Sequence, residues 1–331
     1  MITARNVNGA LHDALWWLKV AGVEEDSRNG PVRVAPGPVL TEYRRPCERV
    51  LFSAVRDANP YFHMFEALYM LAGRSDLAWL TQFNVRMAEF SDDGEYLHGT
   101  YGFRWREWFG FDQLRYLIEH LREQPGSRRA VLTMWSPLGD LIASEGVGGI
   151  SSKDIPCNVS AFFDLRGGAL NMTVTCRSND VLFGAMGANA VHFSFLLEYV
   201  AMHLGVPVGV YRQFSNNFHA YTALPKYPSA DPGITGCADR YESAGVCSLP
   251  LLQLGETAEE WDRDLDLLFA ETTHVKTYYT RFFGEVATPM LVSWHERKRG
   301  RPQDGRNVAE LIAAEDWRAA CLEWIDRREV K

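Results

Sequence analysis

Cys157 is the residue whose position first suggests chemistry. It follows Pro156 and stands just before residues 158–165, an apolar segment that predicts a β-strand. A second such segment, residues 169–176, follows Arg166-Gly167-Gly168, which is typical of a hairpin turn. A hairpin would return Arg177 to Cys157, and a guanidinium beside a thiol stabilises the nucleophilic thiolate. We therefore expect Cys157 to act as a covalent nucleophile, although a lone Cys is more often a small buried apolar residue.

Arginines stand at three places that would suit a bound anion. Arg177 is followed by Ser178, Arg128 and Arg129 stand together before a strand, and Arg28 lies within residues 27–30. Guanidinium groups hold phosphate oxygens bidentately, and a hydroxyl adds a further donor. The ordinary alternative for each is a solvated surface arginine. For Arg128 and Arg129 we expect partial burial, because they lead directly into an apolar strand.

Other polar residues sit in unusual surroundings. Glu66 is the one acid in the apolar segment 61–72, and a buried acid is costly unless it is partnered or functional. Asn216, Asn217, His219 and Tyr221 form a polar run after a predicted strand. That run suits either a sugar-binding edge or a plain polar loop.

The elements that must position these residues follow from hydrophobic periodicity and turn signals. Helices are predicted over residues 8–21, 61–72, 111–123, 189–204, part of 257–284 and 307–328. Strands are predicted over 129–135, 158–165, 169–176 and 207–214, with loop and edge strand at 27–40 and a Gly/Ser-rich loop at 144–152. This order predicts an α+β fold in which helices pack on a mixed sheet. We place a catalytic domain at 1–296, and a basic linker with a C-terminal helix at 297–331.

Composition excludes several classes of protein. The chain has 331 residues, 47% of them hydrophobic and 23% charged, so disorder over most of its length is excluded. The net charge of −8 argues against a nucleic-acid-binding role. Six scattered Cys without a CxxC pair predict neither a disulfide framework nor a zinc site, so no metal is expected. We see no secretory signal and no apolar stretch approaching 18 residues, which predicts a cytoplasmic protein with no membrane span.

Taken in order, these motifs resemble the thymidylate synthase family over roughly residues 25–225. The resemblance rests on Ser27-Arg28-Asn29-Gly30, Glu66, Tyr101-Gly102 with Trp105-Arg106, Ser127-Arg128-Arg129, Ile155-Pro156-Cys157, Arg177-Ser178-Asn179-Asp180, Asn189 and His219-x-Tyr221. Each motif alone is weak, whereas eight in sequence order are specific.

The resemblance implies a role for each matching residue. Cys157 would attack C6 of a pyrimidine nucleoside monophosphate, and C5 would then take a one-carbon unit from 5,10-methylenetetrahydrofolate. The phosphate would be bound by Arg28, Arg177 and Ser178, and, across an obligate homodimer, by Arg128 and Arg129 of the other subunit. Asn189 would read the base, and His219 and Tyr221 would hold the ribose. Asp180 would lie on the folate side, Glu66 would order water and move protons, and Tyr101 would assist proton removal from C5.

Departures from the family pattern point to one branch of it. Asn158 stands where His usually follows the nucleophile, Cys176 replaces a Gln, residues 184–189 carry an extra residue, and residues 84–89 lack the expected Trp. The chain also continues into a helix where a short apolar tail usually closes the site. A wetter site would let water, rather than hydride, add to the one-carbon unit. The chain therefore resembles the pyrimidine nucleotide 5-hydroxymethylases more than the methylating enzymes.

The base is less strongly indicated, because a carboxamide at Asn189 suits uracil or cytosine. Deoxycytidylate hydroxymethylases usually carry Asp there. The excess of Arg over Lys and the altered run before Asn189 resemble the CMP hydroxymethylases of nucleoside-antibiotic biosynthesis, so the sequence favours CMP. A dUMP or dCMP hydroxymethylase and an ordinary thymidylate synthase are the alternatives. More remote are a cysteine hydrolase that pairs Cys157 with His219, and a non-catalytic nucleotide-binding regulator.

Overall fold

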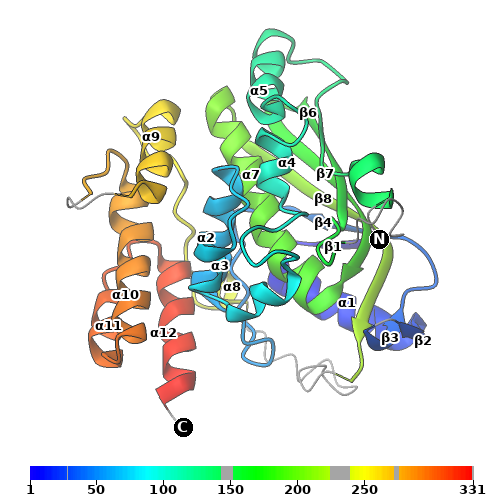
Figure 1. Cartoon of the computed structure of the whole chain (residues 1–331), viewed down its shortest axis with the longest axis horizontal. Helices are drawn as coiled ribbons and strands as arrows, with labels where there is room; N and C mark the ends of the chain where they lie inside the picture. Colours follow the sequence, from blue (N-terminus) through cyan, green and yellow to red (C-terminus); the bar gives the residue numbers. More distant parts are fainter. Residues whose placement is uncertain (28, 143–151, 224–238, 272–275, 330–331) are drawn as a thin grey trace.

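The computed structural model describes residues 1–27, 29–142, 152–223, 239–271 and 276–329. Helices cover a mixed sheet, which confirms the predicted α+β class (Figure 1). The strands are β1 (Ile2–Ala4), β2 (Val23–Ser27), β3 (Gly30–Val34), β4 (Val39–Tyr43), β5 (Val131–Thr133), β6 (Asn158–Arg166), β7 (Ala169–Asp180) and β8 (Val208–Tyr221). The longer helices are α1 (Val7–Ala21), α2 (Pro60–Leu71), α5 (Gln113–Glu123), α7 (Asn189–Leu204), α9 (Ala258–Phe269), α10 (Thr288–Lys298), α11 (Pro302–Ala309) and α12 (Glu315–Glu329). Shorter helical segments are α3 (Leu77–Thr81), η1 (Val85–Phe90), α4 (Tyr101–Arg106), η2 (Pro137–Leu141), η4 (Val181–Ala188), α8 (Arg240–Ser243) and η6 (Phe282–Ala287).

The sheet runs in the order β1-β4-β8-β7-β6-β5, and the β2–β3 hairpin joins it through β3 and β8. The β6–β7 hairpin forms as the sequence predicts, with Gly167 and Gly168 at φ values of 61° and 79° in its turn. Strands β7 and β8 are parallel neighbours, and they are joined through η4 and α7. Because the strands are parallel and Asp180 at the end of β7 pairs with His219 near the end of β8, their carboxyl ends form one edge of the sheet. This edge carries polar side chains.

Strand β8 is longer than the sequence predicts. The sequence predicts that it ends at residue 214, before a polar run that suits either a sugar-binding edge or a loop, but the strand continues to Tyr221. Residues 215–219 pair with β7 on one side, while Ser215 pairs with β4 and residues 219–221 pair with β3 on the other. The segment therefore has strand neighbours within the sheet. The polar run at Asn216–Tyr221 therefore belongs to an interior strand rather than to a loop.

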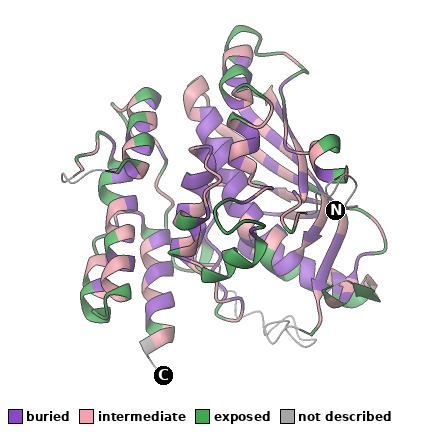
Figure 2. Ribbon diagram, in the orientation of Figure 1, coloured by how far each residue is buried: buried purple, intermediate pink, exposed green. Residues whose placement is uncertain are grey.

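Helix α7 is the core helix, and Figure 2 shows it buried along most of its length. Together with η4 it makes a 24-residue segment, Val181–Leu204, which is long and apolar enough to cross a membrane by length and composition alone. A search for continuous apolar runs does not find it, because Asn189, His192 and Glu198 interrupt the segment. Its apolar window is 83% buried inside the protein, as expected for a core helix.

The C-terminal region differs from the single helix expected at 307–328. It contains α11 and α12, separated by a turn in which Ile312 and Ala314 are buried. The turn lets α11 pack on α10 while α12 packs on α2, where Trp324 meets Tyr61 at a ring separation of 5.6 Å. The basic segment at 297–306 is largely helical, and the proposed boundary after residue 296 falls inside α10. That division into domains stays a prediction.

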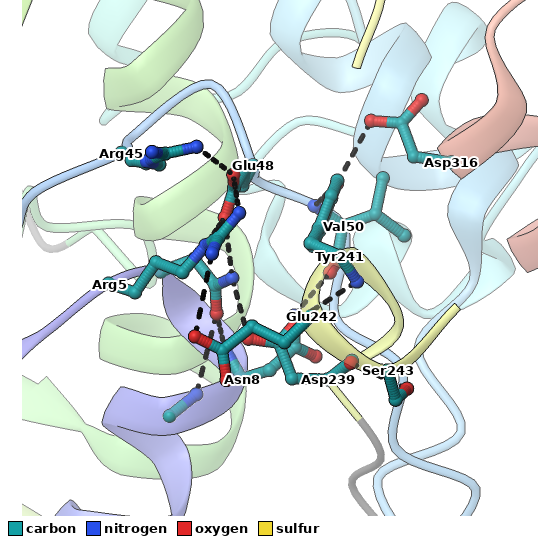
Figure 3. Close-up of polar contacts among 12 residues, drawn as sticks. Arg5, Asn8, Arg45, Glu48, Val50, Asp239, Tyr241, Glu242, Ser243 and Asp316 are labelled. Carbon is teal, nitrogen blue, oxygen red and sulfur yellow. Dashed lines mark hydrogen bonds and ion pairs between the residues drawn. The ribbon is translucent and has the colours of Figure 1, made fainter. Parts of the chain in front are cut away.

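A polar cluster ties the N-terminus to the far end of the chain (Figure 3). Glu48 accepts hydrogen bonds from Arg5 at 2.7 Å and from Asn6 at 2.8 Å, and Asn6 also donates to Asp239. Tyr241 accepts from the backbone N–H of Val50 and donates to Asp316 of α12 at 2.9 Å. These bonds hold the segment that leads into α2, and thereby the helix that carries Glu66.

Gly102 sets how closely α4 approaches α2. A Cβ at this position would lie 2.0 Å from the backbone oxygen of Met70, and a backbone atom of a packed helix cannot easily move away. The glycine thereby holds Tyr101, at the start of α4, against the core.

We therefore expect Gly102→Ala to lower the free energy of unfolding by about 1–3 kcal/mol, because it overpacks a helix contact. Denaturant unfolding would measure the change. Gly126→Ala is the matched control, since its Cβ would meet nothing within 4 Å, and its effect should stay within about 0.5 kcal/mol. Equal stability of the two variants would contradict the close approach.

Candidate active site

Cys157 lies immediately before β6, and the hairpin places Arg177 opposite it as expected. The backbone N–H of Arg177 donates to the Cys157 carbonyl at 2.8 Å. The guanidinium itself turns toward the preceding loop, where it donates to the carbonyls of Pro156 at 2.8 Å and Ile155 at 3.1 Å. Arg177 thus has two functions available: it holds the segment that presents the partly exposed thiol, and it places a positive charge nearby.

Tyr101 binds the backbone at Cys157. Its Oη accepts the backbone N–H groups of Cys157 and Asn158, each at 3.2 Å. Burial raises the pKa of this phenol, so the group keeps its proton at neutral pH. Because both bonds are accepted, the hydroxyl proton can be donated toward the space beside Cys157.

Asn189 opens α7 and is only 7% exposed. Its Oδ1 accepts from Asn158 Nδ2 at 3.1 Å, and its Nδ2 donates to Asn179 Oδ1, also at 3.1 Å. The residue predicted to read a base is therefore held on both sides by other amides. Asn158 and Asn179 were missed as functional residues, although the departure from His at 158 was a signal.

Asp180 ends β7 at the start of η4. One carboxyl oxygen accepts the backbone N–H of Phe183 at 2.6 Å, while the other is buried and has no hydrogen bond among the described residues. Burial raises the pKa of this carboxyl to about 6, and the nearby Arg56 cation opposes that rise. A carboxyl that titrates near neutral pH can take up and release a proton during a reaction.

Arg56 is a third residue that sequence analysis missed. Its Nε donates to the carbonyl of Leu182, and its guanidinium lies over the ring of Phe183 at 4.3 Å. It is a buried arginine beside a buried acid, but the two are more than 120 residues apart in sequence. Only the packing of the 50–58 segment against η4 brings them together.

Glu66 lies on α2, and its side chain faces α7. Its Oε2 is 3.1 Å from His192 Nε2, and neither atom makes a hydrogen bond of good geometry among the described residues. His63 lies one turn before Glu66, and burial, with Arg56 and His192 nearby, lowers the pKa of His63 well below its ordinary value. The two histidines could have been found from their spacing, three residues from Glu66 and three from Asn189.

His219 and Tyr221 occupy the end of β8 near Asp180, because His219 and Asp180 are register partners. His219 Nδ1 lies 2.7 Å from Asn217 Oδ1, and burial lowers the pKa of the imidazole, which favours its neutral form. Tyr221 Oη accepts from Asn29 at 3.4 Å. Ser178 pairs with Asn217 in the adjacent strand. Arg28 lies outside the described residues, between Ser27 and Asn29 of the β2–β3 turn.

Arg128 and Arg129 stand apart from this group. Strand β5 runs antiparallel to β6, so Ala130 meets Phe163 at the end of β6 that lies away from Cys157. Six residues of β6 separate Phe163 from Cys157, which corresponds to about 20 Å along the strand. Both arginines are exposed in the single chain, so the expected partial burial is wrong for the isolated subunit. Within the described part of the chain, neither makes an ion pair.

The site thus combines a partly exposed thiol, a protonated phenol, a fixed amide and two partly buried acids. Among the described residues there is no group of three or more His, Cys, Asp or Glu side chains that could hold a metal ion. Such a set suits covalent addition to a polar ring followed by proton transfers.

Comparisons with known proteins agree with this geometry. The family model for thymidylate synthase matches residues 53–234. The chain is 45% identical to the deoxyuridylate hydroxymethyltransferase of Pseudomonas phage M6, over 99% of this chain and 94% of that protein. It is 40% identical to the enzyme of the same name from Bacillus phage SP01, over 56% of this chain and 49% of that protein. The crystal structure of thymidylate synthase from T4 phage superposes with a TM-score of 0.52 at 18% identity, covering 64% of this chain and 76% of that one, which supports the fold alone.

The Asp180 carboxyl should titrate near pH 6, which carbon-detected NMR of labelled Asp would measure. Arg56→Gln should raise that midpoint, because it removes the cation that favours the carboxylate, whereas Arg56→Lys should leave it closer to wild type. A pKa raised above the ordinary value of about 4 means that the folded state binds the extra proton. The contribution of Asp180 to stability should therefore fall as pH rises from about 4 to about 6, and Asp180→Asn should remove this dependence. A midpoint near 4 in wild type would contradict the burial of the carboxyl.

Proposed function

Because this chain belongs to the thymidylate synthase family, we propose that it is a deoxyuridylate 5-hydroxymethylase that uses 5,10-methylenetetrahydrofolate and water. The observation that carries the proposal is the 45% identity, over nearly the full length of both chains, to a phage deoxyuridylate hydroxymethyltransferase. The sequence analysis also favours hydroxymethyl transfer, so the prediction and the similar proteins agree on this reaction. The preference for CMP is not supported, because two of the similar proteins are named deoxyuridylate hydroxymethyltransferases, which favours the dUMP alternative. A role in antibiotic biosynthesis is not supported either.

The reaction we propose uses residues of this chain in named roles. The Cys157 thiolate adds to C6 of the uracil, which makes C5 nucleophilic, and C5 takes the one-carbon unit that the folate supplies. In this proposal, Tyr101 and the Glu66–His192 pair move protons at the base. Loss of the C5 proton and departure of tetrahydrofolate then leave an exocyclic methylene on C5. Water adds to this methylene as the Cys157 thiolate leaves C6, which gives the 5-hydroxymethyl nucleotide.

We propose that water rather than hydride adds to the one-carbon unit because the segment at residues 84–89 leaves the site open to solvent. Residues 84–89, which lack the expected Trp, form part of η1, and Val85 in that turn is 70% exposed. Arg86 there pairs with Glu89 across solvent at 3.5 Å. A charged, hydrated turn would exclude water less well than an indole.

Asp180 suits a folate co-substrate. Pterin rings carry adjacent N–H groups from which a carboxylate can accept hydrogen bonds, and the buried oxygen of Asp180 lacks a hydrogen-bond partner among the described residues. We propose that Asp180 orients the folate and exchanges a proton with it near neutral pH.

The sheet offers a face for a second subunit. Phe162, Phe214 and Val131 are 44%, 37% and 38% exposed, and strand register places them on the face opposite the one that packs against α7. We propose a homodimer through this face, in which Arg128 and Arg129 bind the nucleotide phosphate in the partner's site. These arginines precede a strand that meets β6 about six residues, or about 20 Å, from Cys157 of the same chain. This separation supports a role for them in the partner's site.

A product assay tests the activity. Purified protein with methylenetetrahydrofolate and a mixture of dUMP, dCMP, UMP and CMP should give hydroxymethyl-dUMP by mass spectrometry, with no dihydrofolate absorbance. Cys157→Ala should reduce turnover by at least about a thousandfold. A methyl product with dihydrofolate would instead identify an ordinary thymidylate synthase. Turnover without folate would point to a different reaction.

Phe162→Glu should give a monomer by sedimentation, because it places a charge on the apolar face of the sheet. It should also lose activity, whereas Phe111→Glu, on a similarly exposed ring away from the sheet, should keep both dimer and activity. Mixing inactive Cys157→Ala chains with inactive Arg129→Ala chains should restore about a quarter of wild-type activity, since half the dimers then carry one complete site. No recovery from a confirmed mixed dimer would contradict shared sites.

A further inference from the structure

Five buried polar side chains form a continuous hydrogen-bonded series through the site. Gln213 Nε2 donates to Asn158 Oδ1 at 3.5 Å, and Asn158 Nδ2 donates to Asn189 Oδ1 at 3.1 Å. Asn189 Nδ2 then donates to Asn179 Oδ1 at 3.1 Å, and Asn179 Nδ2 donates to Ser215 Oγ at 2.9 Å. We call this series the amide relay; it joins β6, β7, β8 and the start of α7.

The amide relay is almost entirely removed from water. Its members are between 0 and 7% exposed, and Asn189 is the most exposed of them. Burying several amides is costly unless each finds a partner, and apolar side chains would fill the same space without that risk. Gly184 adds a steric requirement, because a Cβ there would lie 2.6 Å from Asn179 Oδ1. The chain thus leaves room for the junction between Asn179 and Asn189.

Every link of the relay runs in the same direction. If Asn189 alone were reversed, its NH2 would face the NH2 of Asn158 and its carbonyl would face the carbonyl of Asn179. Both hydrogen bonds would be lost in a buried setting, so the relay holds the amide in one orientation. The two bonds use one lone pair and one N–H of Asn189, which leaves one acceptor and one donor for a ligand.

We propose that Asn158 and Asn179 are positioning residues that make the site specific for a 4-oxo pyrimidine over a 4-amino pyrimidine. This inference rests on the proposed function, in which Asn189 contacts the base. Uracil presents a donor at N3 and an acceptor at O4, whereas cytosine presents an acceptor at N3 and a donor at N4. A single amide orientation pairs with one of these edges and opposes the other. The relay, rather than Asn189 alone, therefore sets the base preference.

Asn158→Asp tests the direction of the relay. A carboxylate only accepts, so the side chain introduced at position 158 can keep the bond from Gln213 but cannot donate to Asn189 Oδ1. Asn189 would reverse to donate to the new carboxylate, Asn179 would reverse to donate to Asn189, and the Ser215 hydroxyl would donate to Asn179. All bonds are then satisfied with the opposite edge facing the base. Titration calorimetry at pH 8 with dUMP and with dCMP should show the ratio of dissociation constants shifting toward dCMP by about tenfold or more.

Asn179→Asp is the matched control, because it makes the same chemical change at the other side of Asn189. The carboxylate introduced at position 179 can accept from Asn189 Nδ2 and from the Ser215 hydroxyl, so the described direction is preserved. This variant should retain the wild-type preference for dUMP. An unchanged ratio in Asn158→Asp, or the same shift in both variants, would overturn the proposal.

Asn158→Leu covers the case in which a buried carboxylate prevents folding. It removes the donor without adding charge, and discrimination between dUMP and dCMP should fall toward unity. Retained discrimination would count against the relay.

The same titrations separate this proposal from the proposed function. Wild-type protein that prefers dCMP would overturn the dUMP assignment and, with it, the 4-oxo preference proposed for the relay, whereas a dUMP preference that Asn158→Asp leaves unchanged would overturn the relay proposal alone. Wild-type protein that binds neither nucleotide would overturn the proposed function, and the relay proposal with it.

Discussion

The parallel pairing of β7 with β8 is the constraint on which the site depends. Its register places Ser178 beside Asn217 and Asp180 beside His219, so the polar residues of two distant segments share one edge. The crossover through η4 and α7 returns the chain over the same sheet and places Asn189 and His192 beside Asn179 and Glu66. Displacing β8 by one residue would turn each of its side chains to the opposite face of the sheet and separate these groups.

Around that pairing, buried polar groups are satisfied mainly by one another. Tyr101 takes up two backbone N–H groups beside Cys157, and Arg177 takes up the carbonyls before it. Each such bond contributes only about 1 kcal/mol net, but leaving its partner unmade costs more. The result is a site whose side chains are held before any substrate arrives, which is the condition for efficient electrostatic catalysis.

Some buried polar atoms have no hydrogen-bond partner among the described residues, and those of Asp180, Glu66 and His192 lie in the candidate site. The buried oxygen of Asp180 and the Glu66–His192 pair have no well-formed hydrogen bonds among the described residues. A ligand that supplies those bonds would gain affinity from groups that are otherwise unsatisfied. The open face of the sheet is a comparable exception at the level of packing, because apolar side chains such as Phe162 are substantially exposed there.

The sequence by itself determined the elements and the family: the β6–β7 hairpin, helices α1, α2, α5 and α7, the adjacency of Cys157 and Arg177, and the α+β class. These follow from periodicity, turn glycines and motif order, which are local in the chain. Other features depend on tertiary structure, which local sequence patterns do not encode. Residues 216–221 belong to an interior strand, the C-terminal region forms the two helices α11 and α12, and Arg56 is buried beside Asp180. Tertiary structure also left Arg128 and Arg129 exposed, far from their own Cys157, and joined three asparagines from three different elements into one directed series. Hydrogen-bond partners and burial depend on which segments meet in space, and residues separated by dozens of positions meet only after the sheet has formed.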